Sequence, residues 1–198
     1  MVHTPDVSGT RPPGAGKSSF DLIEPARLLP ELPLQPGITF LDLGCGAGNY
    51  TLAVAEVLGK HGVVVALDLW QPGLETLEER AAATGRHNIR ARLADISKLV
   101  PLGDDSVDVC LMATVLHDLA EFALAEGALQ EAHRVLKPAG TLAIVEFDKV
   151  DGPPGPPRRI RLAPEEVEHL VVPYGFQKTR TVRVGPYNYL ILFTNAND

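Results

Sequence analysis

The sequence predicts an α/β fold, a mostly parallel sheet covered by helices on both faces with an antiparallel hairpin at one edge. Apolar, β-branched segments alternate along the chain with segments of helical periodicity, which is typical of parallel sheets buried on both faces. The last two strand-like segments, FQKTRTVRV (176–184) and YNYLILFT (187–194), are joined only by Gly185-Pro186. Because no helix carries the chain across the sheet between them, we expect these two strands to pair antiparallel.

The first half of the chain supplies three strands and three helices. Residues 1–19 are rich in Pro, Gly, Ser and Thr and predict a flexible arm before a single domain over 20–198. PARLLPEL (25–32) predicts a short helix interrupted by prolines. ITFLDL (38–43), VVVALDL (63–69) and NIRARLAD (88–95) predict strands. YTLAVAEVLG (50–59) and PGLETLEERAAATG (72–85) predict helices, each ending at a glycine.

The second half continues the alternation. SVDVCLMAT (106–114) predicts a strand after the turn GDDS, and EFALAEGALQEAHRVLK (121–137) predicts one amphipathic helix stopped by Pro138 and Gly140. TLAIVEF (141–147) predicts the next strand. DGPPGPP (151–157) predicts a loop, and PEEVEHLV (164–171) predicts the last helix.

Composition limits the function classes. The formal net charge of −7 argues against nucleic acid, because phosphate contacts require a basic surface. No apolar run reaches the length of a membrane span, and the N-terminus has no apolar signal core, so we expect a cytoplasmic protein. Cys45 and Cys110 form no disulfide framework, and with scattered histidines they predict no metal cluster.

Two glycine-rich stretches compete as ligand loops. RPPGAGKSS (11–19) contains Gly-Lys-Ser, but a P-loop requires another glycine five residues before Gly16, where Arg11 stands, and a preceding strand. FLDLGCGAGNY (40–50) lies between a predicted strand and helix, where ligands of doubly wound sheets bind. Asp68 ends the second strand about 20 residues beyond Gly48, which suits a carboxylate that binds ribose hydroxyls.

The glycine spacing discriminates between ligands. A dinucleotide fingerprint places its third glycine at position 49, but this chain has Asn49 there and Gly48 one residue earlier. Asp42 also precedes Gly44 by two residues, and a carboxylate is unfavourable beside a pyrophosphate. A ligand with an ammonium and a sulfonium suits this acidic turn better, so the motif favours S-adenosylmethionine over NAD.

These residues resemble a known family. LDLGCGAGNY, ALD, LADISKLVPLGDDSVDVCLMATVLHD and EAHRVLKPAGTLAIVEF are similar to motifs of the class I S-adenosylmethionine-dependent methyltransferases. The similarity is strongest to the small-molecule branch that includes the ubiquinone and menaquinone C-methyltransferases, and it covers about 20–147. It implies a Rossmann-like, doubly wound, seven-stranded sheet whose last strand inserts antiparallel.

The resemblance also implies a cofactor site at the glycine turn. By this resemblance Gly44, Cys45 and Gly46 lie along the methionine part of S-adenosylmethionine, and Asp42 lies near its amino group. S-adenosylhomocysteine would be the product.

The same resemblance assigns the adenosine end. It places Asp68 at the ribose hydroxyls and Leu69 at the adenine. Asp95 would accept a hydrogen bond from the adenine amino group, and Ile96 would donate its backbone N–H.

Methyl transfer requires little catalytic machinery. It is an in-line displacement in which the protein orients the nucleophile and excludes water, and one base suffices to remove a proton. By the same resemblance, the backbone at Met112 and Ala113 would lie near the sulfonium. His117, in the predicted loop after the fourth strand, is the candidate base. Alternatively, His117 caps the next helix or contacts the cofactor. We expect Asp118 to be the N-cap of the helix that begins near Glu121.

The sequence indicates only the class of the methyl acceptor. The fourth strand runs into MATVLHD and lacks the Asn/Asp-Pro-Pro-aromatic signature of amino-group methylation, so a small-molecule acceptor, lipid-like or anionic, is favoured. Arg158, Arg159 and Arg161 either bind an anionic acceptor or belong to a solvated loop. Tyr187 and Tyr189 either line the acceptor site or belong to the hydrophobic core or the edge of the sheet.

Several alternatives stay open. Residues 148–164 are short where many relatives carry a helical cap. Either this loop and the N-terminal arm form a minimal lid, or the site is open to a larger acceptor or a partner chain. A non-catalytic S-adenosylmethionine-binding module and an NAD-dependent dehydrogenase are the competing functions. The sequence leaves a homo-oligomer open.

Overall fold

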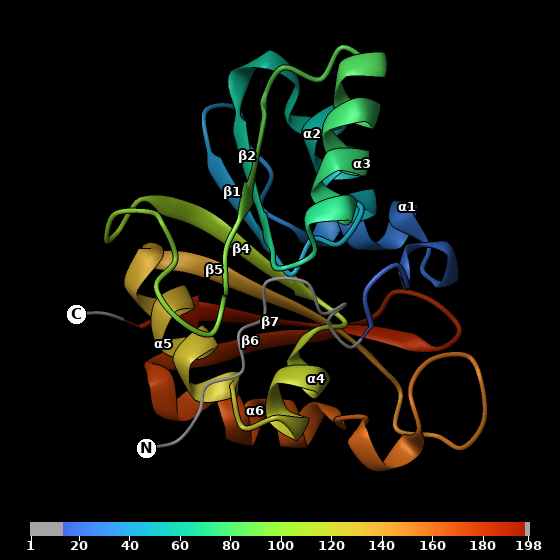
Figure 1. Ribbon diagram of the computed structural model, residues 1–198. Coiled ribbons are helices and arrows are strands. Elements are labelled where there is room, and N and C mark those ends of the chain that lie inside the picture. The colour runs from blue at the N-terminus through green and yellow to red at the C-terminus, as the bar shows by residue number, and fades with distance from the viewer. Residues whose placement is uncertain (1–13, 197–198) are drawn as a thin grey trace, which may run out of the picture.

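The computed structural model describes residues 14–196 as a seven-stranded sheet flanked by helices (Figure 1). The strand order is β3-β2-β1-β4-β5-β7-β6. The strands are β1 Thr39–Leu43, β2 Val63–Asp68, β3 Ile89–Leu93, β4 Val107–Ala113, β5 Leu136–Phe147, β6 Phe176–Arg183 and β7 Asn188–Asn195. Only β7 runs antiparallel to its neighbours, β5 and β6. The predicted fold class, including the antiparallel edge hairpin, is confirmed.

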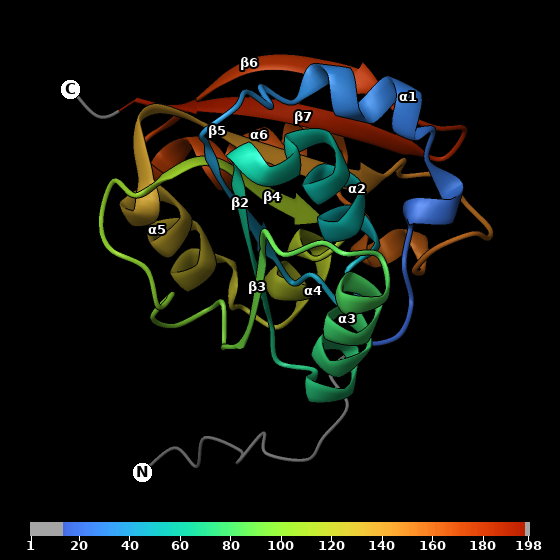
Figure 2. The ribbon, with the colours of Figure 1, turned by 90° about the horizontal axis from the view of Figure 1, so that it is seen from above.

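Helices cover both faces of the sheet (Figure 2). They are α1 Pro25–Leu28, α2 Asn49–Leu58, α3 Gln71–Ala83, α4 Leu116–Glu121, α5 Ala125–Val135 and α6 Pro164–Val171. Alternate side chains of each strand point to opposite faces. Phe40 of β1 accordingly packs in the cluster with α1 and α2, whereas Leu41 and Leu43 pack in the cluster with α4, α5 and α6. This alternation divides the hydrophobic core into two layers.

The helix predicted over 121–137 is present as α5, but it is shorter than predicted at both ends. The structure ends α4 at Glu121, begins α5 at Ala125, and starts β5 at Leu136. Ala123 between the helices has a φ of 56°, a left-handed conformation that interrupts helical hydrogen bonding. At the other end Leu136 is extended, with a ψ of 132°, and pairs with Val107 of β4. The apolar periodicity continues through both points, so it conceals the breaks.

The sheet register brings three loops to one edge. Leu43, the last residue of β1, lies opposite Leu67 of β2 and Met112 of β4. Because these strands are parallel, the glycine turn, the end of β2 and the end of β4 lie together at the carboxyl edge. Ligands of open α/β sheets bind at this edge.

Gly48 explains why the third glycine of the turn comes early. It is the N-cap residue of α2 with a φ of 76°, and a Cβ added there would lie 2.3 Å from Cδ1 of Leu77 in α3. Gly85 has a similar φ of 65° but open space around it. The glycine at position 48 therefore allows α2 and α3 to approach each other.

We expect Gly48→Ala to lower the free energy of unfolding by about 1–3 kcal/mol more than the control Gly85→Ala. Both variants force alanine into a left-handed conformation, but only the first creates a clash. Urea unfolding of the two variants measures the difference. If both variants lose the same free energy of unfolding, the packing of α2 against α3 is not the reason for a glycine at position 48.

Candidate functional site

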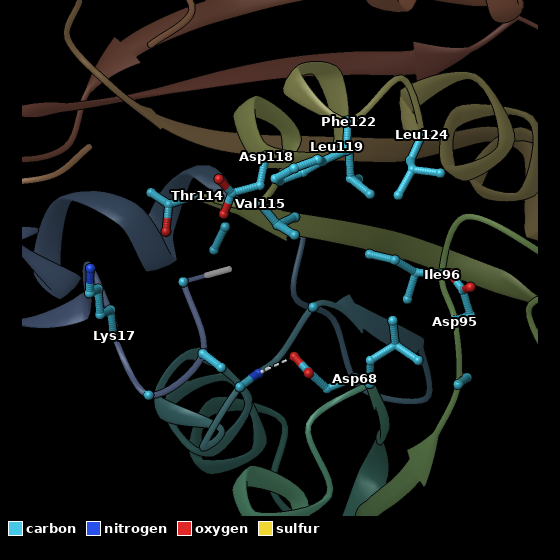
Figure 3. A pocket seen from close by; sticks show the side chains of 18 residues that line it. Lys17, Asp68, Asp95, Ile96, Thr114, Val115, Asp118, Leu119, Phe122 and Leu124 are labelled. Carbon is cyan, nitrogen blue, oxygen red and sulfur yellow. Dashed lines mark hydrogen bonds between the residues drawn. The ribbon is translucent and has the colours of Figure 1, made fainter. Parts of the chain in front are cut away.

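A pocket opens at the carboxyl edge of the sheet, and we refer to it as the central pocket (Figure 3). Its volume is about 180 Å³ and its surface is largely apolar. The lining residues are Gly14, Ala15, Gly16, Lys17, Gly44, Gly46, Asp68, Leu69, Ala94, Asp95, Ile96, Ala113, Thr114, Val115, Asp118, Leu119, Phe122 and Leu124. They come from the ends of β1, β2 and β4, from α4, from the segment after β3 and from the segment before α1.

Asp68 is held rigidly at the wall of this pocket. One carboxylate oxygen accepts a hydrogen bond of 2.7 Å from the backbone N–H of Gly46, the dashed line in Figure 3. The other oxygen accepts one of 2.7 Å from the N–H of Trp70. The carboxylate thus ties the end of β2 to the glycine turn, and each oxygen keeps a further lone pair for a ligand.

Asp95, which follows the neighbouring strand β3, is held as a carboxylate at the wall of the same pocket. It accepts hydrogen bonds from the backbone N–H and the hydroxyl of Ser97, at 3.1 and 2.7 Å, and Lys98 lies 2.9 Å away. Burial alone would raise the pKa of Asp95, but the bonds from Ser97 and Lys98 outweigh it and lower that pKa. The group is therefore ionised near neutral pH.

A smaller, polar pocket of about 40 Å³ adjoins the glycine turn. It is lined by Lys17, Ser18, Ser19, Asp42, Gly44, Cys45, Gly46, Ala47, Asn49, Tyr50, Ala113 and Thr114. Asp42 is buried there and accepts a 2.5 Å hydrogen bond from the hydroxyl of Thr51. Burial raises the pKa of Asp42 to about 7, against the opposing effect of the Thr51 hydrogen bond. The carboxyl group is therefore poised to change its charge near neutral pH.

A third, lateral pocket of about 500 Å³ lies beside α4. It is lined by Gly14, Lys17, Ser18, Ser19, Leu22, Thr114, His117, Asp118, Phe147, Gly155, Pro156, Pro157 and Ile160. Four of these residues also line the central pocket, namely Gly14, Lys17, Thr114 and Asp118. The two pockets are therefore neighbours that share a wall.

His117 and Glu146 form a buried pair at the lateral pocket. Nδ1 of His117 lies 2.8 Å from Oε2 of Glu146, and Glu146 is fully buried. The backbone N–H of His117 donates to the other oxygen of Glu146 at 3.1 Å. Burial would lower the pKa of His117, but the hydrogen bond and charge of Glu146 raise it above its usual value. The pair fixes the ring so that Nε2 is the nitrogen not engaged by Glu146, and Nε2 lies 3.7 Å from Asp118.

The structure brings most of the predicted cofactor residues to these pockets. Those lining the central pocket are Gly44, Gly46, Asp68, Leu69, Asp95, Ile96 and Ala113. Asp42 and Cys45 line the polar pocket instead. Met112 lies fully buried in the core and lines none of the three pockets.

The expectations for α4 need correction. Asp118 is not the N-cap of a helix beginning near Glu121, because it lies inside α4, whose N-cap position is Val115. His117 is also inside α4 and not in a loop. The chain turns into a helix directly after β4, and this early start buries the ring of His117 against β5.

Arg161 is neither an anion-binding nor a solvated residue. Its side chain is 1% exposed, and its guanidinium donates to four backbone carbonyl oxygens. The acceptors are Pro156, Asp148, Gly152 and Pro154, at 2.8, 3.1, 2.6 and 2.7 Å. Arg161 therefore closes the loop over 148–157 on itself. Arg158 and Arg159 remain exposed, with Asp151 and Glu121 as partners.

Tyr187 and Tyr189 of the C-terminal hairpin differ in burial. Tyr189 is buried in the core and donates a hydrogen bond of 2.7 Å to the carbonyl of Leu162. Tyr187 is 39% exposed. Neither residue lines the lateral pocket.

The sequence predictions omit several lining residues, including Val115, Leu119, Phe122 and Leu124 of the central pocket, and two further groups matter most for the site. The first is 14–17, which the sequence assigned to a flexible arm; residues 1–13 of that arm lie outside the described residues. The second is Glu146, whose signal was a carboxylate inside the apolar strand TLAIVEF. The two proposed lid segments do lie on the same pocket, since 14–19 and 155–160 both contribute lining residues to the lateral pocket.

The part of the chain that the structure describes contains no group of three or more His, Cys, Asp or Glu residues arranged to hold a metal ion. Within 14–196, no helix has both the length and the apolarity to cross a membrane.

The sheet with its inserted antiparallel strand, and the pocket at the glycine turn, define the class I S-adenosylmethionine-dependent methyltransferase fold. A family model described as a methyltransferase domain matches residues 34–175. The chain therefore belongs to the methyltransferase domain family, a class whose methyl donor is S-adenosylmethionine.

Individual relatives agree with this assignment. A demethylmenaquinone methyltransferase of Geobacillus stearothermophilus is 32% identical over 57% of this chain and 47% of that protein. A 2-phytyl-1,4-naphtoquinone methyltransferase of Nostoc sp. is 35% identical over 58% of this chain and 49% of its own length. The chain thus spans about half the length of these curated relatives. The crystal structure of a SAM-dependent methyltransferase from Aquifex aeolicus is similar with a TM-score of 0.81 and 28% identity, covering 98% of this chain and all of that one.

Proposed function

We propose that this protein transfers a methyl group from S-adenosylmethionine to a hydroxyl-bearing, quinol-like small molecule by in-line displacement. One observation carries the proposal: the His117–Glu146 pair faces a pocket of about 500 Å³ that shares a wall with the central pocket. A base in a large pocket that adjoins the proposed cofactor site is the arrangement that acceptor deprotonation requires. The alternative function, a non-catalytic S-adenosylmethionine-binding module, does not explain why His117 and Glu146 are paired here.

The central and polar pockets would together hold the methyl donor. We assign the adenine to the apolar part near Leu69 and Ile96, within reach of Asp95, and the ribose hydroxyls to Asp68. The polar pocket with Asp42 would receive the amino-acid end along the glycine turn. When bound, S-adenosylmethionine supplies an electrophilic methyl group on a positively charged sulfur.

His117 would prepare the acceptor. Glu146 engages Nδ1, so the other nitrogen, Nε2, would take the proton from an acceptor hydroxyl in the lateral pocket. The electron density released onto the acceptor oxygen, or through an aromatic ring onto its carbon, makes that atom the nucleophile. As its bond to the methyl group forms, the methyl–sulfur bond would break and leave S-adenosylhomocysteine; after attack by a ring carbon, the proton of that carbon would then leave to restore the aromatic ring. Phe147 and the 155–160 segment, with 14–19 opposite, would exclude water from the reaction.

The quinol class is favoured by two kinds of support. The lateral pocket combines the polar groups above with an apolar wall that includes Leu22, Phe147 and Ile160, which suits a flat ring carrying hydroxyl groups. The curated relatives named above act, by their names, on demethylmenaquinone and on 2-phytyl-1,4-naphtoquinone. The cytoplasmic location and the absence of nucleic acid partners stay predictions from composition, and oligomeric state stays open.

A panel of acceptors tests this proposal. The purified protein is incubated with methyl-labelled S-adenosylmethionine and a reduced demethylated naphthoquinone, with catechol, with glycine, or with a denatured protein mixture. We expect label in the naphthoquinol, a weaker signal in catechol and none in the amine or protein acceptors. Labelling of glycine or protein in preference to the two hydroxylated rings would contradict the acceptor class.

Cofactor affinity should depend on pH through Asp42. Its pKa is about 7, so the carboxyl group is neutral below this pH and ionised above it, and only the ionised form attracts the cofactor ammonium. We expect the affinity for S-adenosylmethionine to rise by up to about tenfold between pH 6 and pH 8. In Asp42→Asn this dependence should vanish; calorimetry at a series of pH values makes the comparison. A parallel pH dependence in both proteins would exclude Asp42 as its source.

A further inference from the structure

Lys17 stands where the three pockets meet. It lines the central, the polar and the lateral pocket. Among the residues that line these pockets it is the one lysine or arginine, while the acidic residues are Asp42, Asp68, Asp95 and Asp118. The residues that line the three pockets therefore include four carboxyl groups and a single permanent cation.

Among the residues that the structure describes, the ammonium of Lys17 forms no ion pair with a carboxylate, although its charge acts on Asp118, where it opposes the effect of burial on the pKa of that carboxyl group. Within residues 14–196, no carboxylate oxygen lies within 4.0 Å of this ammonium. Two of the four acidic side chains are engaged elsewhere: Asp68 with backbone N–H groups, and Asp95 with Ser97 and Lys98. The cation is therefore available to a ligand.

The segment that carries Lys17 is anchored to the site. The hydroxyl of Ser19 is 2.8 Å from that of Tyr50 and 3.1 Å from that of Thr114. The ring of Phe20 packs edge-on against Tyr50 at 5.0 Å between centroids. Lys17 is only two residues before Ser19, so these contacts hold the backbone that carries its exposed side chain beside the pockets that it lines.

The proposed cofactor has one anionic group. Its α-carboxylate lies on the same carbon as the ammonium, and we assigned that end to the polar pocket with Asp42. A carboxylate placed among acidic side chains is unfavourable unless a cation accompanies it. Lys17 is the one permanent cation that lines the polar pocket.

We propose that the ammonium of Lys17 binds the α-carboxylate of S-adenosylmethionine, so that the 14–19 segment forms one wall of the cofactor site. This inference rests on the proposed function. The segment lies outside residues 34–175, the part that the family model matches. The lysine of Gly-Lys-Ser would then bind a carboxylate and not a phosphate.

Calorimetry with four ligands tests the contact without an acceptor. S-adenosylmethionine and S-adenosylhomocysteine carry the carboxylate, decarboxylated S-adenosylmethionine lacks only that group, and 5′-methylthioadenosine lacks the whole amino-acid end. We expect Lys17→Met to weaken the first two by about ten- to a hundredfold and to change the last two by less than about twofold. Lys60→Met, which removes an exposed lysine far from the pockets, should change none of them.

Other outcomes overturn the inference. Equal weakening of all four ligands would mean that Lys17 only shapes the segment, and unchanged affinities would mean that it makes no contact with the cofactor. If the unaltered protein binds none of the four ligands, the proposed function fails with it. Normal binding by the unaltered protein, with no ligand-dependent loss in Lys17→Met, rejects the Lys17 contact alone.

Discussion

Arg161→Met is expected to lower the free energy of unfolding by about 3 kcal/mol or more. Methionine fills much of the same volume but leaves four loop carbonyl oxygens without their donor, and each buried unpaired group costs about 1–3 kcal/mol. The stacking of the guanidinium over Phe147, 5.6 Å from the ring centre, is lost as well. Urea unfolding followed by the fluorescence of Trp70, the sole tryptophan, measures the change.

The neighbouring arginines supply matched controls. Arg158 and Arg159 are exposed, so their replacement by methionine should cost less than about 1 kcal/mol each. A similar loss in all three variants would show that the loop is held by general charge effects instead of by the buried guanidinium. Because Phe147 also lines the lateral pocket, Arg161→Met should disturb the acceptor site as well.

Glu146→Gln is expected to lower turnover by about a hundredfold, within the range that a general base contributes. Glutamine keeps the shape of the side chain but loses the charge that raises the pKa of His117. His117 must be neutral to accept a proton, so the rate of the unaltered enzyme should rise with pH through an apparent pKa above the usual 6.5. In Glu146→Gln this rise should move to lower pH while the affinity for S-adenosylmethionine stays the same.

The dependence of the rate on pH shows whether Glu146 positions and charges His117 or only supports the fold. His117→Ala should abolish the rise, because no imidazole remains to titrate. A Glu146→Gln enzyme with the original rate and an unshifted profile would contradict the role of Glu146. The raised pKa also links to folding: the pair stabilises the fold fully below pH 6.5, and this stabilisation declines as pH rises through the folded-state pKa.

The fold was predictable because its main signals are local. Apolar strands alternate with helices, and the hairpin after Phe176 has no room for a crossover, so strand pairing follows from chain connectivity. The break at Ala123 was not predictable in the same way. Its left-handed conformation interrupts a run whose periodicity continues on both sides, so the pattern carries no sign of it.

The site was predictable only where backbone geometry determines it. Gly44 and Asp68 lie at strand ends, so their position follows from the sheet. Arg161 was misread because a charged residue after a proline-rich loop suggests solvent exposure. Prolines have carbonyl acceptors but no N–H donors, so such a loop has an excess of acceptors that one buried guanidinium can satisfy. Lys17 was missed because its segment reaches the site only through tertiary contacts.

The most direct test of the whole account measures binding and turnover on the same sample. The protein is saturated with methyl-labelled S-adenosylmethionine and supplied with the naphthoquinol acceptor or a metabolite extract, and S-adenosylhomocysteine and labelled product are quantified together. We predict equal amounts of the two products, with His117→Ala forming neither at a comparable rate although it binds the cofactor normally. Tight cofactor binding without S-adenosylhomocysteine formation under any of these conditions would contradict the account and indicate a non-catalytic binding module.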